Sequence, residues 1–549
     1  MSKVLDNPFY YLDNFARVLE WIAERYPDLL SEAERAFIDA FFGLPQPSRA
    51  LLIRMVMRKG TLFRSSRLNY AEIGCAQEAA RALLPTGWIT RDPHLTLEQV
   101  FELLSKPEIA SAFGLTGHAR LARKEAQLLG LRAQFRAARP FSAWHRGATD
   151  CLFQITIKPL CDRLRLIFFG NLRQDWTEFV LSDLGVYKYE QVPFEAASRG
   201  FRSRRDIDHY VALHACSERL HGAAPIDEVL RELPPAPPDN EWLSSRRERL
   251  VFQIAQLAEK QHDWARAYPL YAGCRAAGAR ARAIRVLEKN QQIKAAFTLL
   301  AEAERAPESD AERQQLLRIA PRLRRRLGHA PLAVRRVVAP KRLDLHLPMP
   351  QQNRWVEGAV RDHLTRPDAP VFYVENALIN SLFGLLCWRA IFSAIPGAFF
   401  HPFHRAPADL RSADFVPRRA ALFDACLADI DNGAYRDIIR SNYAAKQGVQ
   451  SPFVHWEALS EELLEMALAC IPPAHLRKWC ERILHDVEAN RTGFPDLIQF
   501  WPHEGRYHMI EVKGPGDRLQ DNQLRWIDYC TAHGMPVSVC YLQWQEQRQ

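Results

Sequence analysis

The pattern of hydrophobic and polar residues predicts that the chain begins with a small helical domain. In FARVLEWIAERY and RALLIRMVMRKG, apolar side chains recur at the three- and four-residue spacing of amphipathic helices. In residues 95–140, Thr96 can cap the helix LTLEQVFELL, and a glycine-containing turn leads into HARLARKEAQLLGLRAQFR. Two short helices around a turn are therefore expected in this second segment.

The middle of the chain is predicted to consist of helical hairpins that follow a linker. Successive prolines in LPPAPPD, at residues 233–239, disfavour both helix and sheet, so a domain boundary is expected near residue 235. Beyond it, segments such as RRERLVFQIAQLAEKQ and IKAAFTLLAEAER place Ala and large apolar residues at helical spacing. This pattern is similar to tetratricopeptide-type repeats, which stack into a solenoid. A second linker is expected around HLPMPQQNR.

The last part of the chain alternates in a different way and predicts a mixed α/β module. GFPDLIQF and YHMIEVKG read as two strands, the helix is expected to start at about Leu519, and PVSVCYL reads as a third strand. Upstream, VFYVENALINSLFGLLCW predicts a strongly apolar helix that would be buried. The fold class is therefore multidomain and mostly α, with a C-terminal α/β domain.

The composition is that of a folded protein, and positive and negative charges are unevenly distributed along the chain. The 549 residues are 48% hydrophobic and 25% charged, as in folded multidomain proteins. The net charge of +9 is unevenly spread, because residues 371–549 carry 17 Lys and Arg against 21 Asp and Glu, which leaves a surplus of 13 positive charges in the first 370 residues. A basic platform joined to an acidic, cation-binding module would give this distribution, although solvated helix faces would give it too.

Several classes of protein are disfavoured by the sequence. The eleven cysteines form no CxxC pair, so neither a zinc ribbon nor a thioredoxin-type redox site is indicated. The N-terminus lacks the apolar run of a secretory signal. The most apolar stretch, residues 377–400, is interrupted by Asn380, Arg389 and Pro396, which argues against a membrane span. We expect a cytoplasmic protein, associated with the nucleoid if the source is bacterial.

Candidate catalytic chemistry lies on the two predicted strands of the C-terminal module. Asp496 begins the first strand, and Glu511 and Lys513 follow fifteen and seventeen residues later on the second. Residues at i and i+2 share one face of a strand, so Glu511 and Lys513 point into the same space while Val512 points into the core. If the strands form a hairpin, Asp496 lies beside Glu511.

These residue types suit metal-assisted hydrolysis of a phosphodiester. Two carboxylates can bind Mg²⁺ or Mn²⁺, with the Val512 carbonyl as a further ligand and with room for water and a phosphate oxygen. Lys513 would orient the water or stabilise the developing charge. The alternative is an edge hairpin in which Glu511 and Lys513 form a surface ion pair worth ~0–1 kcal/mol. That alternative does not explain the Gly-Pro-Gly turn directly after the lysine.

A third acid and a set of basic residues complete the candidate sites. Glu375, at the start of the apolar helix, would be a third metal ligand, or else only a capping charge. Gln523 lies one turn into the last helix. Basic residues near the N-terminus, interleaved with Phe63 and Tyr70, suit a DNA-binding platform or a solvated helix face. They are Arg54, Arg58, Lys59, Arg64, Arg67, Arg120, Arg123 and Lys124.

Several motifs resemble those of a known family. EVKGPGDRLQDNQ with upstream GFPDL resembles the VRR-NUC nuclease domain, and VENALINSLFGLLCWRAIF with GAFFHPFHRAPADL is similar to its opening in the Fanconi-associated nuclease family. IRMVMRKGTLFRSSRLNYAEI and LIFFGNLRQDWTEFVLSDLG resemble that family's N-terminal DNA-binding and middle segments. The domains implied are a helical DNA-binding domain at 1–90, a SAP-like and middle DNA-binding region at 91–235, tetratricopeptide-like repeats at 236–345 and a PD-(D/E)xK nuclease domain at 346–549.

The resemblance implies a function as well as a fold. It implies a structure-specific nuclease for branched or flapped double-stranded DNA, with 5′-flap endonuclease and 5′-to-3′ exonuclease activity of the phosphodiesterase I type, in repair of interstrand crosslinks. It also implies that Glu375, Asp496 and Glu511 bind the metal, that Lys513 is catalytic and that Gln523 supports the site. Animal members have a lysine where this chain has Asn522, so recognition of a 5′-terminal phosphate would differ, with Arg491 and Arg518 as candidate contributors.

Two other functions remain open from the sequence. One is a general or restriction-like endonuclease that uses the same metal site without preference for flaps. The other is a catalytically silent scaffold that binds DNA, and a protein partner through the helical repeats. The presence of Glu375, Asp496, Glu511 and Lys513 together disfavours the scaffold.

Overall fold

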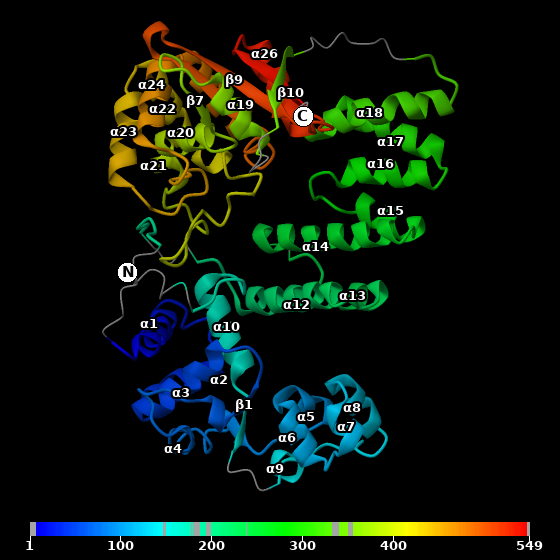
Figure 1. Cartoon of the computed structure of the whole chain (residues 1–549), viewed down its shortest axis with the longest axis vertical. Coiled ribbons are helices and arrows are strands. Elements are labelled where there is room, and N and C mark those ends of the chain that lie inside the picture. The colour runs from blue at the N-terminus through cyan, green and yellow to red at the C-terminus, as the bar shows by residue number, and fades with distance from the viewer. Residues whose placement is uncertain are drawn as a thin grey trace. The chain divides into compact units, whose positions relative to one another are not determined.

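The computed structural model describes residues 7–146, 150–176, 178, 187–193, 199–237, 239–331, 340–349 and 355–545. Part of the predicted middle segment, at residues 177 and 179–185, lies outside this set. The chain forms two compact units (Figure 1). The first comprises Met1–Tyr187 and Gly200–Ile207, and the second comprises Lys188–Arg199 and Asp208–Gln549.

The first unit opens with the helical domain that the sequence predicts. Its helices bury the apolar stripes seen in the sequence, as with Phe15, Val18 and Ile22 of the first helix. A three-stranded antiparallel sheet, in the order β1-β5-β2, joins the domain to later residues. The elements are α1 (Tyr10–Arg25), α2 (Glu32–Phe42), α3 (Gln46–Met57), β1 (Leu62–Arg64), η1 (Ser65–Arg67), α4 (Ala76–Ala80), β2 (Ile89–Arg91), β5 (Leu152–Ile155) and α10 (Lys158–Phe169).

A second small core in this unit covers residues 94–144. Thr96 caps its first helix as predicted, because its hydroxyl accepts a hydrogen bond from the Gln99 N–H at 3.4 Å. Val100, Ile109 and Trp144 are buried together. In place of the expected two helices, this segment contains five short ones, α5 to α9, and a two-stranded sheet. The elements are β3 (His94–Leu95), α5 (Leu97–Leu103), α6 (Lys106–Ala112), α7 (Gly117–Leu121), α8 (Lys124–Leu131), β4 (Arg139–Pro140) and α9 (Phe141–Trp144).

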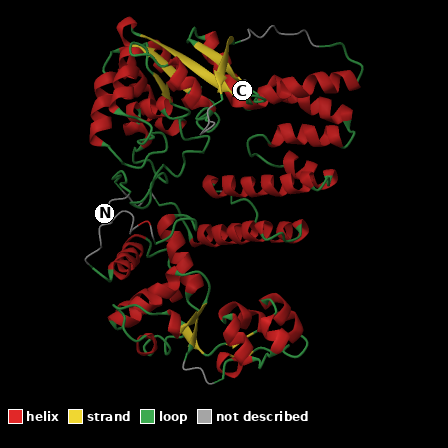
Figure 2. Ribbon diagram, viewed as in Figure 1, coloured by secondary structure: helices red, strands yellow, loops and turns green. Residues whose placement is uncertain are grey.

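The second unit begins with a stack of helices (Figures 1 and 2). The proline cluster separates two helices here, but it does not separate two domains. Leu213 and Val229, which precede the prolines, share one core with Ile254 and Tyr271, which follow them. The boundary expected near residue 235 is therefore wrong, since apolar packing continues across it. The helices are α12 (Arg204–His221), of which the residues up to Ile207 belong to the first unit, α13 (Ile226–Glu232), α14 (Glu241–Lys260), α15 (Trp264–Ala272), α16 (Ala279–Lys289), α17 (Ile293–Arg305) and α18 (Asp310–Arg326).

The turns between these helices repeat in structure. His262, after α14, has φ of 61°, and its N–H donates to the Glu259 carbonyl at 3.0 Å. Gln291, after α16, has φ of 60°, and its N–H donates to the Glu288 carbonyl at 3.2 Å. The two turns lie 29 residues apart, and each begins a new helix after two residues or fewer. The helical-hairpin repeat expected from the sequence is present.

The C-terminal module is built on a five-stranded mixed sheet in the order β6-β10-β9-β8-β7. The strands are β6 (Lys341–Pro348), β7 (Val371–Tyr373), β8 (Leu497–Trp501), β9 (Arg506–Lys513) and β10 (Val537–Gln545). The hairpin of β8 and β9 is confirmed. The linker expected around residues 346–354 is partly wrong, because residues up to Pro348 belong to β6, which pairs in parallel with β10. Residues 350–354 lie outside the described set.

Helices cover both faces of this sheet. One face carries Ile498, Met509 and Val539 in the large core of the helices that follow β7, and the other carries Leu497 and Val512 in a smaller core under α19. The helices are α19 (Val356–Leu364), α20 (Leu378–Leu386), α21 (Trp388–Ile391), α22 (Ala420–Asp431), α23 (Tyr435–Ala445), α24 (Glu461–Cys470), α25 (Pro473–His485) and α26 (Asp521–Ala532), with η3 (Pro417–Arg419) and η4 (Pro502–Glu504). None of the helices in the described ranges has the length and apolar character needed to span a bilayer.

Candidate active site

The sheet register places the predicted catalytic residues together. Ile498 pairs with Met509 and Leu497 pairs with Ile510, so the next position of the antiparallel ladder sets Asp496 opposite Glu511. Glu511 and Lys513 share the face of β9 that carries Met509. That face changes from apolar core to polar side chains at the end of the strand.

Contacts within this group are short. The Lys513 Nζ lies 2.7 Å from Glu511 Oε1. The backbone N–H of Val512 donates to Asp496 Oδ2 at 2.8 Å. Glu511 is fully buried, and Asp496 and Lys513 are only 6% and 7% exposed. A surface ion pair on an edge hairpin is therefore excluded, because β9 is an inner strand and its polar side chains are buried.

Burial and mutual repulsion dominate the electrostatics. Burial, and secondly the charge of Asp496, raise the pKa of Glu511 to about 8, although Lys513 opposes the rise. Burial also raises the pKa of Asp496 to about 6, against the Val512 hydrogen bond and the charge of Lys513. The negative charges of Glu357 and Glu375 add to the rise at Asp496. Two carboxyl groups with raised pKa values beside an ammonium are typical of a functional site.

Glu375 lies near this group but is turned to a different partner. Its Oε2 accepts a hydrogen bond from the Tyr373 hydroxyl at 2.5 Å, and its side chain is exposed. Within the described ranges, no three His, Cys, Asp or Glu side chains converge closely enough for a metal ion. The predicted convergence of Glu375 with Asp496 and Glu511 is therefore incomplete. Repulsion from Asp496 and the Tyr373 hydroxyl both favour the outward position.

The donor set still fits a hard divalent cation. Glu511 Oε1 is paired with Lys513, but Glu511 Oε2 has no hydrogen-bond partner within the described part of the chain, although both oxygens are inaccessible to water. Buried polar atoms without a hydrogen bond are costly, and carboxylate oxygens are the ligands that Mg²⁺ and Mn²⁺ prefer. A cation beside Asp496 and Glu511 would satisfy these oxygens and offset their repulsion.

Two asparagine contacts position the loop that carries Asp496. Asn376, with φ of 53°, accepts hydrogen bonds on its side-chain oxygen from the N–H groups of Gly493, at 2.8 Å, and Phe494, at 3.3 Å. Gly493 has φ of 96°, and a Cβ there would lie 2.7 Å from the carbonyl carbon of Asn522. The residue after Glu375 thus fixes the approach to Asp496, and only glycine fits against α26.

The start of α26 is held by side chains near the site. Gln523 accepts a hydrogen bond from the Gln520 N–H at 2.8 Å as part of a capping box, so its observed contact stabilises the helix end. Asp521 pairs with Arg318 of α18, with an Nη1 to Oδ2 distance of 2.6 Å. The predicted start of the helix, about Leu519, is two residues early.

Two of the predicted DNA-binding arginines are engaged inside the first unit. Arg64 is 8% exposed, and its guanidinium pairs with Glu108 and Asp150, each at 2.6 Å. Arg54 pairs with Glu72 at 2.6 Å and lies over the Tyr11 ring. The expectation that Arg64 faces DNA is wrong in this structure, because its guanidinium N–H groups donate to Glu108 and Asp150 in buried ion pairs. The contacts of Arg54 likewise indicate a structural role.

The other basic candidates are more accessible. Arg58, Lys59, Arg67, Arg120, Arg123 and Arg518 are exposed. Arg58 donates to the Arg67 carbonyl at 3.0 Å, and Lys124 donates to the Leu104 carbonyl at 2.8 Å. Arg491 donates to the Pro452 carbonyl at 2.5 Å and lies over the Phe453 ring, and burial lowers its pKa.

Sequence reasoning missed three residues that shape the site. Tyr373 and Asn376 fix Glu375 and the loop before Asp496, and Glu357 of α19 contributes to the field at Asp496. Tyr373 and Asn376 flank Glu375 in the stretch YVEN, so proximity in sequence was a usable signal. No motif in the sequence points to Glu357.

Comparisons with known proteins show the family to which this chain belongs. The FAN1 HTH domain matches residues 9–90, the Fanconi anemia-associated nuclease SAP domain matches residues 94–144, and the VRR-NUC domain matches residues 430–544. A Fanconi-associated nuclease 1 homolog from Pseudomonas aeruginosa is 56% identical over 99% of this chain and 97% of its own length. The chain belongs to the Fanconi-associated nuclease family. The resemblance inferred from the sequence is confirmed.

The similarity extends to structure and to distant relatives. The crystal structure of paFAN1 bound to 5′-flap DNA with a two-nucleotide flap and a gap has a TM-score of 0.95, 55% identity and 99% coverage of both chains. A Fanconi-associated nuclease 1 homolog from Arabidopsis thaliana is 24% identical over 96% of this chain and 66% of its own length. The multidomain fold, with helix-turn-helix, SAP and VRR-NUC domains, is confirmed as that of a Fanconi-associated nuclease.

Proposed function

We propose that this Fanconi-associated nuclease is a metal-dependent, structure-specific phosphodiesterase that cuts 5′-flap DNA and degrades DNA from 5′ ends, in repair of interstrand crosslinks. The observation that carries the proposal is the buried group of Asp496, Glu511 and Lys513, in which Lys513 pairs with Glu511 Oε1 and Glu511 Oε2 has no hydrogen-bond donor within the described residues. The paFAN1 structure, which is bound to 5′-flap DNA, supports the substrate class. Such an enzyme would act on cellular DNA, in the cytoplasm and at the nucleoid of a bacterium.

The metal site would be formed by Asp496, Glu511 and the Val512 carbonyl, with Glu375 turning in from its contact with Tyr373. Mg²⁺ or Mn²⁺ suits these oxygen ligands. When bound, such an ion lowers the pKa of a water molecule and offsets the charge that develops on the phosphate. Their raised pKa values favour the protonated forms of Asp496 and Glu511 without a cation, and a bound cation would displace these protons by favouring the carboxylates.

The remaining steps belong to the side chains of the chain itself. Lys513, now 2.7 Å from Glu511, would orient the attacking water or donate to a non-bridging phosphate oxygen. The Val512 N–H holds Asp496 in place while this happens. Gln523 would support the site through the start of α26, where its side chain forms the capping box. These groups leave the nucleophile to water, so no covalent intermediate is required.

Exposed basic side chains would hold the DNA. Phosphate binding by Lys and Arg is independent of sequence and suits a nuclease that recognises branched structure. Arg491 is the weakest of the candidates near the active site, because it is largely buried against Phe453. The proposed contacts are the exposed Arg58, Lys59, Arg67, Arg120, Arg123 and Arg518, together with the half-buried Lys124.

Cleavage of matched substrates tests this function. Purified protein would be incubated with a labelled 5′-flap duplex, a nicked duplex and an intact duplex, each with Mg²⁺, with Mn²⁺ and with a chelator. We expect cleavage of the flap substrate with either ion and none with the chelator. Equal cleavage of intact duplex would support a general endonuclease, and a flap left uncut in both ions would support a DNA-binding scaffold.

A further inference from the structure

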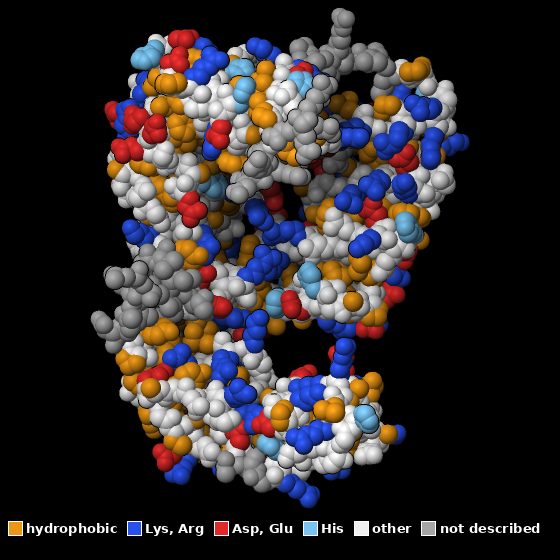
Figure 3. Space-filling model, in the orientation of Figure 1, with side chains coloured by type: hydrophobic (Ala, Val, Ile, Leu, Met, Phe, Trp, Pro, Cys, Tyr) orange, Lys and Arg blue, Asp and Glu red, His pale blue; other side chains and the backbone are white. Residues whose placement is uncertain are grey.

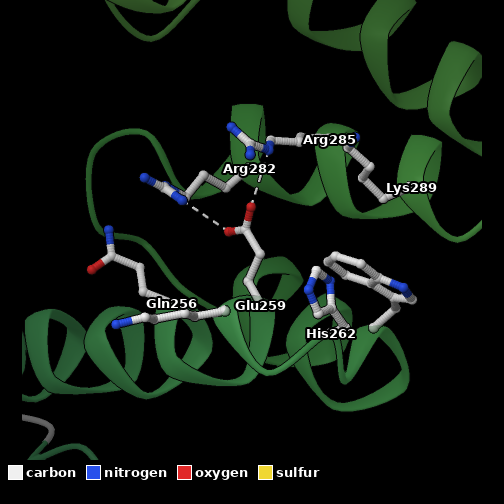
Figure 4. A pocket seen from close by; sticks show the side chains of 8 residues that line it. Gln256, Glu259, His262, Arg282, Arg285 and Lys289 are labelled. Carbon is white, nitrogen blue, oxygen red and sulfur yellow. Dashed lines mark hydrogen bonds and ion pairs between the residues drawn. The ribbon is translucent and has the colours of Figure 1, made fainter.

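A concave site lies in the helical repeats, apart from the active site. It is a pocket of about 440 Å³ among α14, α15 and α16, within the range of ligand-binding cavities. Figure 4 shows Glu259 pointing from its helix toward Arg282 and Arg285, with Lys289 beyond them and His262 at the side. The lining residues are Gln256, Glu259, Lys260, His262, Trp264, Arg282, Arg285 and Lys289.

Glu259 is the only acidic side chain among the residues that line this pocket, and both of its carboxylate oxygens already have partners. Glu259 is 7% exposed, and its Oε2 accepts hydrogen bonds from the Tyr271 hydroxyl at 2.8 Å and from Arg282 at 2.9 Å. Its Oε1 lies 3.1 Å from Arg285 Nε. One carboxylate therefore holds two guanidinium groups in fixed positions, and each keeps further N–H donors available.

The remaining positive charge is unbalanced. Lys260 is the last residue of α14 and Lys289 is the last residue of α16, and both are exposed. Neither lysine forms an ion pair with any residue that the structure describes. Four cationic side chains against one carboxylate give the pocket a surplus of three positive charges. In Figure 3, Lys and Arg side chains are also prominent over the segment that contains these repeats.

Aromatic rings form another part of the pocket wall. The His262 ring is exposed and meets the Trp264 ring edge to face, with centroids 5.2 Å apart. The left-handed backbone of His262, with φ of 61°, sets its ring at the turn between α14 and α15. Cationic side chains that track a phosphate backbone, beside rings on which bases can stack, are the means by which proteins bind single-stranded nucleic acid.

We propose that this pocket binds a single-stranded DNA segment, with Lys260, Arg285 and Lys289 on the phosphates and His262 against a base. The inference rests on the proposed function, because the branched substrate proposed there carries a single-stranded arm. The nuclease site does not need to bind that arm, so another site can bind it. The repeats and the nuclease domain belong to one compact unit, in which α18 contacts α26 through Arg318 and Asp521. An acidic peptide would use the cations but would leave the rings unused.

Binding without catalysis tests the pocket independently of cleavage. The full chain would be titrated, in chelator, with a labelled oligothymidylate of roughly 15 nucleotides, a length near the upper end of single-strand site sizes. The variant is Lys260→Gln with Lys289→Gln, which removes two cations that have no ion-pair partner among the described residues. The control is Lys294→Gln with Arg305→Gln on α17, which removes the same charge outside the pocket.

The pocket variant should bind the oligothymidylate roughly five- to tenfold more weakly, with a salt dependence reduced by about 1.4 in slope. The control variant should bind the oligothymidylate as tightly as the wild type does. The pocket variant should bind a nicked duplex without a flap as tightly as the wild type does. A pocket variant that binds like the wild type, or a control that loses as much, would overturn the proposal. The affinity for octaglutamate is measured in the same way. If the pocket substitutions weaken the binding of octaglutamate but not that of oligothymidylate, the proposal is also overturned, and an acidic protein partner is favoured.

Failure of this proposal and failure of the proposed function give different results. If the wild type leaves the 5′-flap duplex uncut with Mg²⁺ and Mn²⁺, the nuclease function fails whatever the binding data show. If it cuts the flap but binds oligothymidylate equally with and without Lys260 and Lys289, only the pocket fails. A second variant, Arg285→Gln, checks the result on a residue that touches Glu259.

Discussion

The backbone N–H of Val512 donates a hydrogen bond to Asp496 Oδ2 at 2.8 Å. Val512 is the residue between Glu511 and Lys513, so one strand supplies an acid, an amine and the anchor for the second acid. This bond fixes Asp496 from the partner strand with a backbone donor that no substitution of Val512 other than proline removes. The site is therefore preorganised by sheet geometry, with Glu375 as its adjustable member.

Removal of Asp496 should separate catalysis from DNA binding. Asp496→Ala takes away one of the two carboxylates that would hold the metal, so cleavage of 5′-flap DNA should fall roughly a thousandfold or more. Affinity for the same DNA, measured by fluorescence anisotropy in chelator, should stay within about twofold, because phosphate contacts come from basic residues elsewhere. A parallel loss of DNA affinity would contradict this division of labour.

Glu511→Gln should stabilise the metal-free protein at alkaline pH. The folded pKa of Glu511, about 8, lies above its ordinary value of 4.5, so this group favours folding below pH 4.5 and that contribution is lost as the pH rises through 8. Glutamine keeps the neutral form at every pH. The variant should match the wild type near pH 5 and exceed it near pH 9 by roughly 1–3 kcal/mol in the free energy of unfolding.

Chemical denaturation in chelator at the two pH values measures this difference. The positive charge of Lys513, which pairs with Glu511, works against the effect and makes the expected difference in stability smaller. A variant that is less stable than the wild type near pH 9 would show that the ionised Glu511 is well solvated or well paired, and that burial does not raise its pKa.

Arg64 and Arg67 should differ in what they support. Arg64→Ala leaves the buried carboxylates of Glu108 and Asp150 without their shared cation, so it should destabilise the protein by about 3 kcal/mol. Arg67→Ala removes an exposed side chain and should leave stability within about 0.5 kcal/mol. DNA affinity should fall for Arg67→Ala, with a salt slope reduced by about 0.9.

Thermal unfolding and salt-dependent anisotropy on both variants make this comparison. If Arg67→Ala leaves the salt slope unchanged, Arg67 is not at the interface. If Arg64→Ala is as stable as the wild type, the ion pairs with Glu108 and Asp150 do not support the fold.

The loop before Asp496 should depend on Asn376. Asn376→Gly keeps the left-handed backbone but removes the acceptor for Gly493 and Phe494, so it should lower stability by about 1–2 kcal/mol. Asn376→Ala adds backbone strain at φ of 53° and should cost roughly 1 kcal/mol more. Flap cleavage should fall in both, and denaturant midpoints should rank wild type, Gly variant, Ala variant. Equal midpoints for the two variants would show that the backbone relaxes.

The sequence was sufficient for features that follow from local periodicity. The two-residue period of β9 predicted that Glu511 and Lys513 share a face and that Val512 is buried, and the hairpin placed Asp496 beside them. These inferences succeed because strand geometry is nearly invariant. Part of the family resemblance was carried by short motifs in the same strands.

Features that depend on distant partners could not be read from the sequence. β6 ends in Pro348, so its residues resembled a linker, and its strand character comes from pairing with β10 almost 200 residues later. Arg64 looked like an exposed basic residue because its partners, Glu108 and Asp150, lie 44 and 86 positions away. The proline cluster resembled a boundary because the core shared by α13 and α14 depends on tertiary packing.

The central claim is that Asp496, Glu511 and Glu375 bind one or more divalent ions in this Fanconi-associated nuclease. The most direct test is a crystal structure of the protein soaked in Mn²⁺, with anomalous diffraction to locate the metal. We predict an anomalous peak in contact with the carboxylates of Asp496 and Glu511, and Glu375 turned away from Tyr373 toward it. A fully soaked crystal with no peak between Asp496 and Glu511 would contradict the account.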